Sequence, residues 1–177
     1  MASPVPCVCS FGTLPTPTVM VLSRTTLSST RYAASPCHLK FIMLNFMQFF
    51  HGVSNRLTGG GTGRCLGTDE AGGMGEGWSD VAAFWMEQTD ATVKDYTMGS
   101  YVTNQASGIR SHPYSTSKEV NPYTYATLAE KHEVHDMGEI WANTLINVYA
   151  ALVEASGFDA DAASNADSTK GNAIFMQ

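Results

Sequence analysis

Three side chains able to bind metal or move protons lie on stretches whose apolar spacing predicts helices. His51 follows a dense apolar run, Glu76 begins a second apolar-patterned stretch, and His135 begins a third. A tetrahedral zinc ion with one open position takes imidazole and carboxylate donors from separate rigid elements, together with water. Asp80 lies one turn after Glu76 on the same predicted face, where its carboxylate could orient a ligand histidine. The three stretches together therefore predict a zinc site.

Each residue also has a structural explanation when taken alone. A histidine on an apolar helix is more often a core residue with its hydrogen bonds satisfied than a metal ligand. A glutamate at the start of a helix is favoured by the helix dipole. The large aromatic residues of the same stretches are interpreted as ordinary core. It is the combination, and not any single residue, that favours a metal centre.

The elements expected to position these residues are helical. Apolar spacing predicts helices over about 41–50, 76–87 and 135–156, with a short helix near Thr169. Gly157 is expected to end the third helix. Glycine-rich loops are predicted at 58–63 and 72–75, and a long ordered loop at 97–121. Residues 1–39, rich in Ser, Thr and Pro, are predicted to be irregular and without function.

Composition limits the possible partners. The net charge is −6 and the 10 Lys and Arg residues are scattered, which argues against nucleic acid binding. No apolar run reaches the ~18 residues of a membrane span, and the proline-rich N-terminus makes a poor secretion signal. The four cysteines form neither a disulfide framework nor a paired zinc motif, and the partner of Cys65 is left open.

Several blocks of the sequence closely resemble the fungalysin metallopeptidases. The resemblance covers roughly residues 49–177 and is carried by the blocks at 51–60 (HGVSNRLTGG), 72–80 (GGMGEGWSD), 99–104 (GSYVTN), 108–111 (GIRS), 120–122 (VNP) and 134–143 (VHDMGEIWAN). It implies that residues 40–177 are the helical part of a thermolysin-like catalytic domain, mainly α with long loops. It also implies a secreted zinc endopeptidase that acts on protein or peptide substrates and carries a propeptide in its full-length form.

The resemblance also assigns roles to individual residues. His51 matches the second histidine of the motif H-E-x-x-H, and Glu76 matches the third protein ligand of a single zinc ion. Asp80 would lie behind the zinc-binding histidines. By similarity to the thermolysin-like group, His135 would stabilise the oxyanion, and Arg110 would hold a substrate backbone carbonyl.

The motif is broken at its first two positions. Met47 stands where the first histidine is expected, and Gln48 stands where the general-base glutamate is expected. A thioether is a poor zinc ligand, and an amide cannot accept a proton, a loss of about 10²- to 10⁴-fold in rate. We therefore expect this chain to lack useful zinc affinity and peptidase activity.

The residues before Phe49 do not resemble the family, and the chain stops short of its last helices, so a chain truncated at both ends is expected. An unspliced intron or a wrong start in the gene model would explain why the resemblance ends abruptly near Phe49. Sequencing of the mature transcript would test this hypothesis. The alternative function is a non-catalytic fragment that binds peptides or a propeptide through Tyr101, Asn104 and Arg110.

Overall fold

A computed structural model describes the backbone of residues 36–177 and the side chains of residues 45–177. Its elements are α1 (Pro36–Leu57), α2 (Asp69–Glu87), α3 (Ser100–Thr103), the 3-10 helix η1 (Tyr125–Glu130), α4 (Val134–Ser156) and α5 (Gly171–Ile174). Over this part of the chain no strand forms, and one isolated bridge joins Tyr96 to Tyr114. The mainly α class is therefore confirmed. The irregular segment predicted for residues 1–39 falls mostly outside the described residues, and α1 already begins at Pro36.

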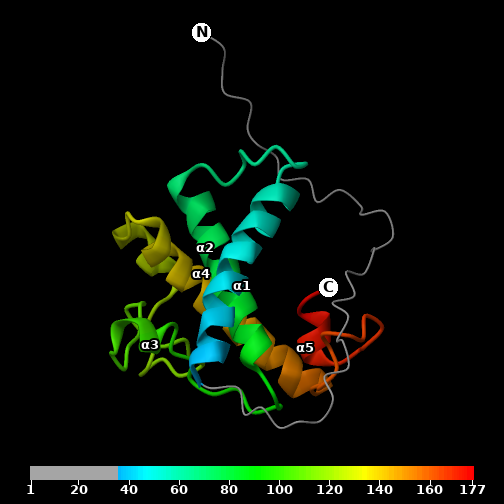
Figure 1. The fold of residues 1–177 in the computed structure, drawn as a ribbon. Helices are drawn as coiled ribbons and strands as arrows, with labels where there is room; N and C mark the ends of the chain where they lie inside the picture. Colours follow the sequence, from blue (N-terminus) through cyan, green and yellow to red (C-terminus); the bar gives the residue numbers. More distant parts are fainter. Residues whose placement is uncertain (1–35) are drawn as a thin grey trace.

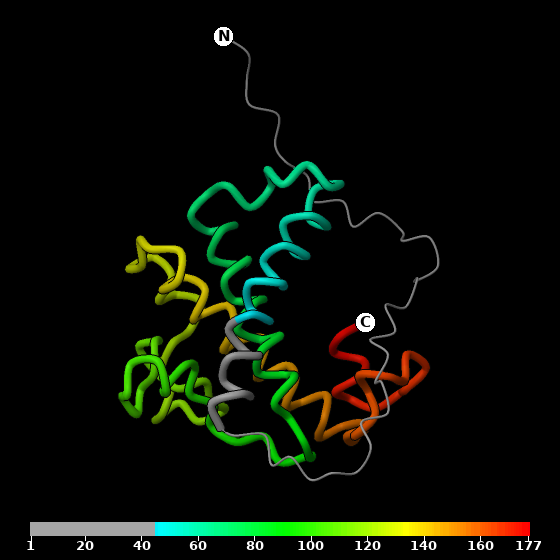
Figure 2. Tube along the Cα trace, in the orientation of Figure 1, coloured from blue at the N-terminus to red at the C-terminus, as the bar shows by residue number. Residues whose placement is uncertain are grey.

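Three long helices form the centre of the fold. Helix α2 packs against both α1 and α4, while η1 and α5 pack against α4. Figure 1 shows α1 crossing in front of α2 and α4, and the tube in Figure 2 follows the same path through the loops. Since each of the three helices carries one of the predicted site residues, their crossing decides whether those residues can meet.

Helix α2 begins earlier than the sequence pattern predicts. The prediction of a start near Glu76, after a glycine loop, is wrong, because the helix begins at Asp69. The Thr68 hydroxyl caps it by accepting a hydrogen bond from the Ala71 N–H at 3.4 Å, and two acidic residues in the first turn suit the helix dipole. Glu76 consequently lies two turns inside the helix.

Close contact with α4 explains why this helix contains glycines. A Cβ on Gly73 would lie 2.7 Å from the Met137 Cβ, and one on Gly77 would lie 2.8 Å from the Gly138 carbonyl oxygen. A glycine inside a helix is unfavourable by about 1 kcal/mol relative to alanine. The contact between α2 and α4 outweighs the low helix propensity of glycine, which is why the glycine cluster was wrongly predicted to be a loop.

The other helix predictions are confirmed. The helix predicted over 135–156 is α4, and Gly157, with a φ of 80°, ends it by donating its N–H to the Val153 carbonyl at 2.8 Å. The short C-terminal helix is α5. The loop at 97–121 contains the short helix α3 and is joined to Tyr96, the residue before it, by two hydrogen bonds of 2.8 Å between Tyr96 and Tyr114.

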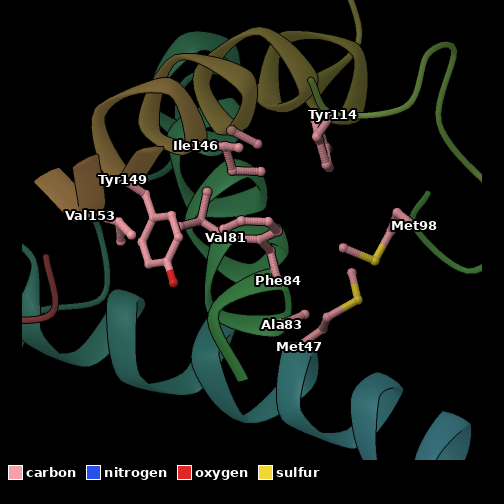
Figure 3. Close-up of a cluster of buried hydrophobic side chains, with 10 residues drawn as sticks. Met47, Val81, Ala83, Phe84, Met98, Tyr114, Ile146, Tyr149 and Val153 are labelled. Carbon is pink, nitrogen blue, oxygen red and sulfur yellow. The ribbon is translucent and has the colours of Figure 1, made fainter. Parts of the chain in front are cut away.

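The core lies where α1, α2 and α4 meet. Its buried members are Met47, Val81, Ala83, Phe84, Met98, Tyr114, Ala142, Ile146, Tyr149 and Val153. Figure 3 shows Met47 extending from α1 toward Ala83 and Met98. The predicted role of Phe84 and Tyr149 as core aromatics is confirmed, since both are fully buried and pack edge to face. Cys65 is disulfide-bonded, and its partner lies outside the described side chains.

Candidate metal centre

The helix crossing brings together the three residues that the sequence singled out. His51 is on α1, Glu76 is on α2 and His135 is in the first turn of α4. The His51 Nε2 and the His135 Nε2 each lie 3.4 Å from the same atom, the Glu76 Oε2. His51 and Glu76 are 24% and 18% exposed, so the cluster is open to solvent at one side.

A second carboxylate holds the other side of the His135 ring. Glu133 caps α4, and its Oε2 accepts hydrogen bonds from the backbone N–H groups of His135 and Asp136. Its Oε1 lies 2.6 Å from the His135 Nδ1, which we assign as the donor because an ionised carboxylate can only accept. Burial opposes ionisation of Glu133, but the hydrogen bonds from the His135 ring and from the backbone N–H groups of Asp136 and His135 together outweigh it, and the pKa of the carboxyl is lowered.

The spacing of His51 and Glu76 suits a zinc ion. Two tetrahedral ligands, each about 2.1 Å from zinc, are about 3.4 Å apart, and the His51 Nε2 to Glu76 Oε2 distance is 3.4 Å. The first histidine of the family pattern is missing, because Met47 stands in its place and is buried in the core, while Gln48 beside it is exposed. Two donors are fewer than the three protein ligands of a catalytic zinc site.

The same conclusion holds for the described chain as a whole. Among its residues, no three His, Cys, Asp or Glu side chains are already arranged to hold a metal ion. The described residues therefore do not fit the family's complete zinc site, although His51 and Glu76, the two predicted ligands, lie close together.

Asp80, one turn after Glu76 in α2, pairs with Arg110. Arg110 Nε donates to Asp80 Oδ2 at 2.7 Å and the second guanidinium nitrogen donates to Oδ1 at 2.9 Å, while the Tyr114 hydroxyl donates to Oδ2. Asp80 is fully buried and Arg110 is 8% exposed. Burial disfavours the charged guanidinium, but the hydrogen bonds to Asp80 and the charge attraction of Asp80, Tyr114 and Glu139 together outweigh this and raise the pKa of Arg110. The roles of Asp80 behind a zinc ligand and of Arg110 on substrate stay predictions.

Glu139 adds a further buried carboxyl one turn after His135. Its Oε1 accepts a hydrogen bond from the Ser111 N–H at 2.8 Å, and its Oε2 has no hydrogen-bond partner. Burial raises the pKa of this carboxyl, against the opposing effect of the Ser111 N–H. Glu139 thereby attaches the residue after Arg110 to α4.

The sequence interpretation missed Glu133, Tyr114 and Glu139. Glu133 carried a usable signal, since a carboxylate at a helix start can cap the helix and reach a histidine two residues later. Tyr114 and Glu139 carried none, because their partners are about thirty residues away along the chain. Of the predicted peptide contacts, Tyr101 lies in α3 and Asn104 ends that helix with a φ of 54°.

Comparisons with known proteins identify the family of this chain. A sequence model of the fungalysin metallopeptidase family (M36) matches residues 46–177. The chain belongs to this family, whose members are generally zinc-dependent.

Fungal relatives support the same conclusion. The chain is 46% identical over 113 residues to extracellular metalloproteinase 9 of Coccidioides posadasii. It is 47% identical over 113 residues both to extracellular metalloproteinase mep of Aspergillus flavus and to extracellular metalloproteinase 2 of Arthroderma gypseum. Each match covers 62% of this chain and 18% of the relative. No helix in the described part is long and apolar enough to cross a membrane.

Proposed function

We propose that this chain derives from the catalytic domain of a secreted zinc metalloendopeptidase and is itself without peptidase activity. The observation that carries the proposal is the pair formed by His51 and Glu76, which come from different helices and lie at the spacing of two zinc ligands. The full-length relatives would cut protein or peptide substrates outside the cell and carry a propeptide.

Further roles belong to the same proposal. His51 and Glu76 are two of the three protein ligands of one zinc ion, and His135 faces the position where an oxyanion would form. Arg110 contacts the substrate backbone, and Asp80 holds Arg110 in place through their paired hydrogen bonds. Asp80 was expected behind the zinc-binding histidines, of which His51 is present and the one at position 47 is replaced by Met47.

The proposed loss of activity rests on positions 47 and 48. Met47 is buried in the core and brings no nitrogen or oxygen donor to zinc. Gln48 is a neutral amide at the position of the general-base glutamate, so the motif lacks a general base. A peptide- or propeptide-binding fragment is not favoured as the alternative, because the relatives are proteinases by name.

Restoring the motif tests the proposal. The 177-residue chain, the variant Met47→His/Gln48→Glu, and that variant with Glu76→Gln would be compared for zinc content by native mass spectrometry and for hydrolysis of casein. We expect no hydrolysis by the unchanged chain, one tightly held zinc in the restored variant, and weaker binding once Glu76 is replaced. Chelator-sensitive hydrolysis by the unchanged chain would contradict the loss of activity, and zinc binding unaffected by Glu76→Gln would contradict the ligand assignment.

A further inference from the structure

Cys65 lies in the turn between α1 and α2 and is disulfide-bonded. Its position is fixed by Gly59, since a Cβ built on Gly59 would lie 2.9 Å from the Cys65 Cβ and closer still to its sulfur. Gly59 comes two residues after Leu57, the last residue of α1. The disulfide is therefore at the C-terminal end of α1, which Figure 1 shows opposite the end where this helix begins.

The length of α1 excludes one of the three other cysteines as the partner. These are Cys7, Cys9 and Cys37, and Cys37 is the second residue of α1. An α-helix rises ~1.5 Å per residue, so about 30 Å separate Cys37 from Leu57. The Cα atoms of two disulfide-bonded cysteines are no more than about 7 Å apart. Cys37 therefore cannot reach Cys65 while α1 is intact.

We infer that Cys65 is bonded to Cys7 or Cys9 of the same chain. The chain is long enough for either bond, because an extended chain covers about 3.3 Å per residue and the stretch from Cys9 to the start of α1 can exceed the ~30 Å length of this helix. The bond joins the first residues of the chain to the turn between the helices of His51 and Glu76. The sequence predicts no function for residues 1–39, whereas this bond gives one of their cysteines a role in the fold.

The bond is a redox-sensitive link. Two thiols lose two protons and two electrons when it forms, and a disulfide donor such as oxidised glutathione accepts them and becomes two thiols. Such bonds persist outside the cell and are rare in the cytosol, where thiols are kept reduced. The inference rests on the proposed function only in placing the chain in an oxidising compartment. Under reducing conditions the turn at Cys65 would lose its covalent connection to the first residues.

Peptide mapping without reduction identifies the partner. The 177-residue chain is oxidised in a glutathione buffer, its free thiols are blocked, and trypsin cleaves it after Lys and Arg. We expect the peptide 65–94, which holds Cys65, to be joined to the peptide 1–24, which holds Cys7 and Cys9. The variants Cys7→Ser and Cys9→Ser decide between the two, because only one of them should lose the joined peptide.

Oxidation of the chain in concentrated guanidinium chloride is the control for chain proximity. Cys37 is about half as far from Cys65 along the chain as Cys9 is, and each doubling of a loop makes closure about 3-fold less favourable. The denatured chain should therefore favour the peptide 33–40, which holds Cys37, over the peptide 1–24. A reversed preference in the folded chain would show that helix α1 selects the partner.

Gly59→Ala tests the position of the sulfur, with Gly60→Ala as its matched control. The two glycines have φ values of 72° and 71°, so alanine strains the backbone similarly at both. A Cβ on Gly60 meets nothing within 4 Å, whereas one on Gly59 would overlap the Cys65 sulfur. Strain makes a disulfide easier to reduce, so Gly59→Ala should need about 10-fold less reduced glutathione for half reduction. Gly60→Ala should leave this concentration unchanged.

Three results would overturn the inference. The first is a peptide 65–94 joined mainly to 33–40 under native conditions, and the second is a free Cys65 thiol after oxidation while circular dichroism shows the helices formed. The third is a dimer linked through Cys65 on a non-reducing gel, which would place the partner in a second copy. None of these readouts depends on zinc or hydrolysis, so they leave the proposed function to its own experiment.

Discussion

Asp80 is fully buried, and three donor atoms from two residues account for its two carboxylate oxygens. Arg110 uses Nε and one terminal nitrogen, and Tyr114 uses its hydroxyl. A buried charge is tolerated only when it is paired and hydrogen-bonded, because leaving water is costly. This pairing holds the loop that carries Arg110 and Tyr114 against α2.

Removal of one partner should therefore be strongly destabilising. Asp80→Ala would leave the guanidinium of Arg110 buried without a counter-charge, and we expect a loss of about 3–5 kcal/mol in the free energy of unfolding. Urea denaturation followed by circular dichroism measures it.

Arg110→Lys is the control for the geometry of this pair. It keeps the positive charge but cannot form the paired hydrogen bonds, so its loss should be smaller than that of Asp80→Ala. A loss below about 1 kcal/mol for Asp80→Ala would show that the pair contributes little to stability.

At the scale of elements, the crossing of α2 and α4 determines the site. A Cβ on Gly138 would lie 2.7 Å from the Glu76 Cβ and 3.0 Å from the Gly73 carbonyl oxygen. The two helices therefore touch through their backbones beside Glu76. Any larger residue at Gly138 would push the start of α4, and His135 with it, away from Glu76.

Gly138→Ala tests this close approach. Overpacking of a tight contact costs about 1–3 kcal/mol, which exceeds the gain in helix propensity from alanine of up to about 1 kcal/mol. We expect a net loss of stability and a lower melting temperature.

Gly52→Ala is the matched control, since Gly52 lies in α1 and a Cβ there meets nothing within 4 Å. It should be neutral or slightly stabilising. Equal effects of the two substitutions would mean that helix propensity alone decides the outcome.

At the scale of the whole molecule, the core and the site share one turn of α1. Met47 and His51 are four residues apart on the same face, yet Met47 packs into the core and His51 faces the cluster. A thioether at position 47 strengthens the core where the family pattern has a metal ligand.

Met47→His should weaken the core and provide a metal ligand at position 47. Placing an imidazole without a hydrogen-bond partner in the core costs about 1–3 kcal/mol, so the metal-free variant should melt at a lower temperature. Zinc should restore stability, by about 2.7 kcal/mol at 100 Kd. Thermal denaturation with and without ZnCl₂ measures both effects.

Met47→Leu conserves volume and should cost less than about 1.5 kcal/mol. Its zinc response should match that of the unchanged chain. A Met47→His variant whose zinc response did not exceed that of Met47→Leu would show that position 47 does not face the metal.

The sequence by itself determined the helices with a clear apolar period and singled out the candidate site residues. Helix α4 and its stop at Gly157 were predictable because side-chain period and a glycine C-cap are local properties. The convergence of His51, Glu76 and His135 could be expected from the family resemblance, because the blocks that carry them are long.

Only the tertiary structure decided where α2 begins and which carboxylates hold the site residues. The glycine cluster at 72–75 predicts a loop, but it lies within α2, where Gly73 leaves room for the close approach of α4. Likewise Asp80 pairs with Arg110 thirty residues away, and Glu139 with Ser111 twenty-eight residues away. Such contacts depend on how the helices cross in space, and the spacing of residues along the chain does not predict that crossing.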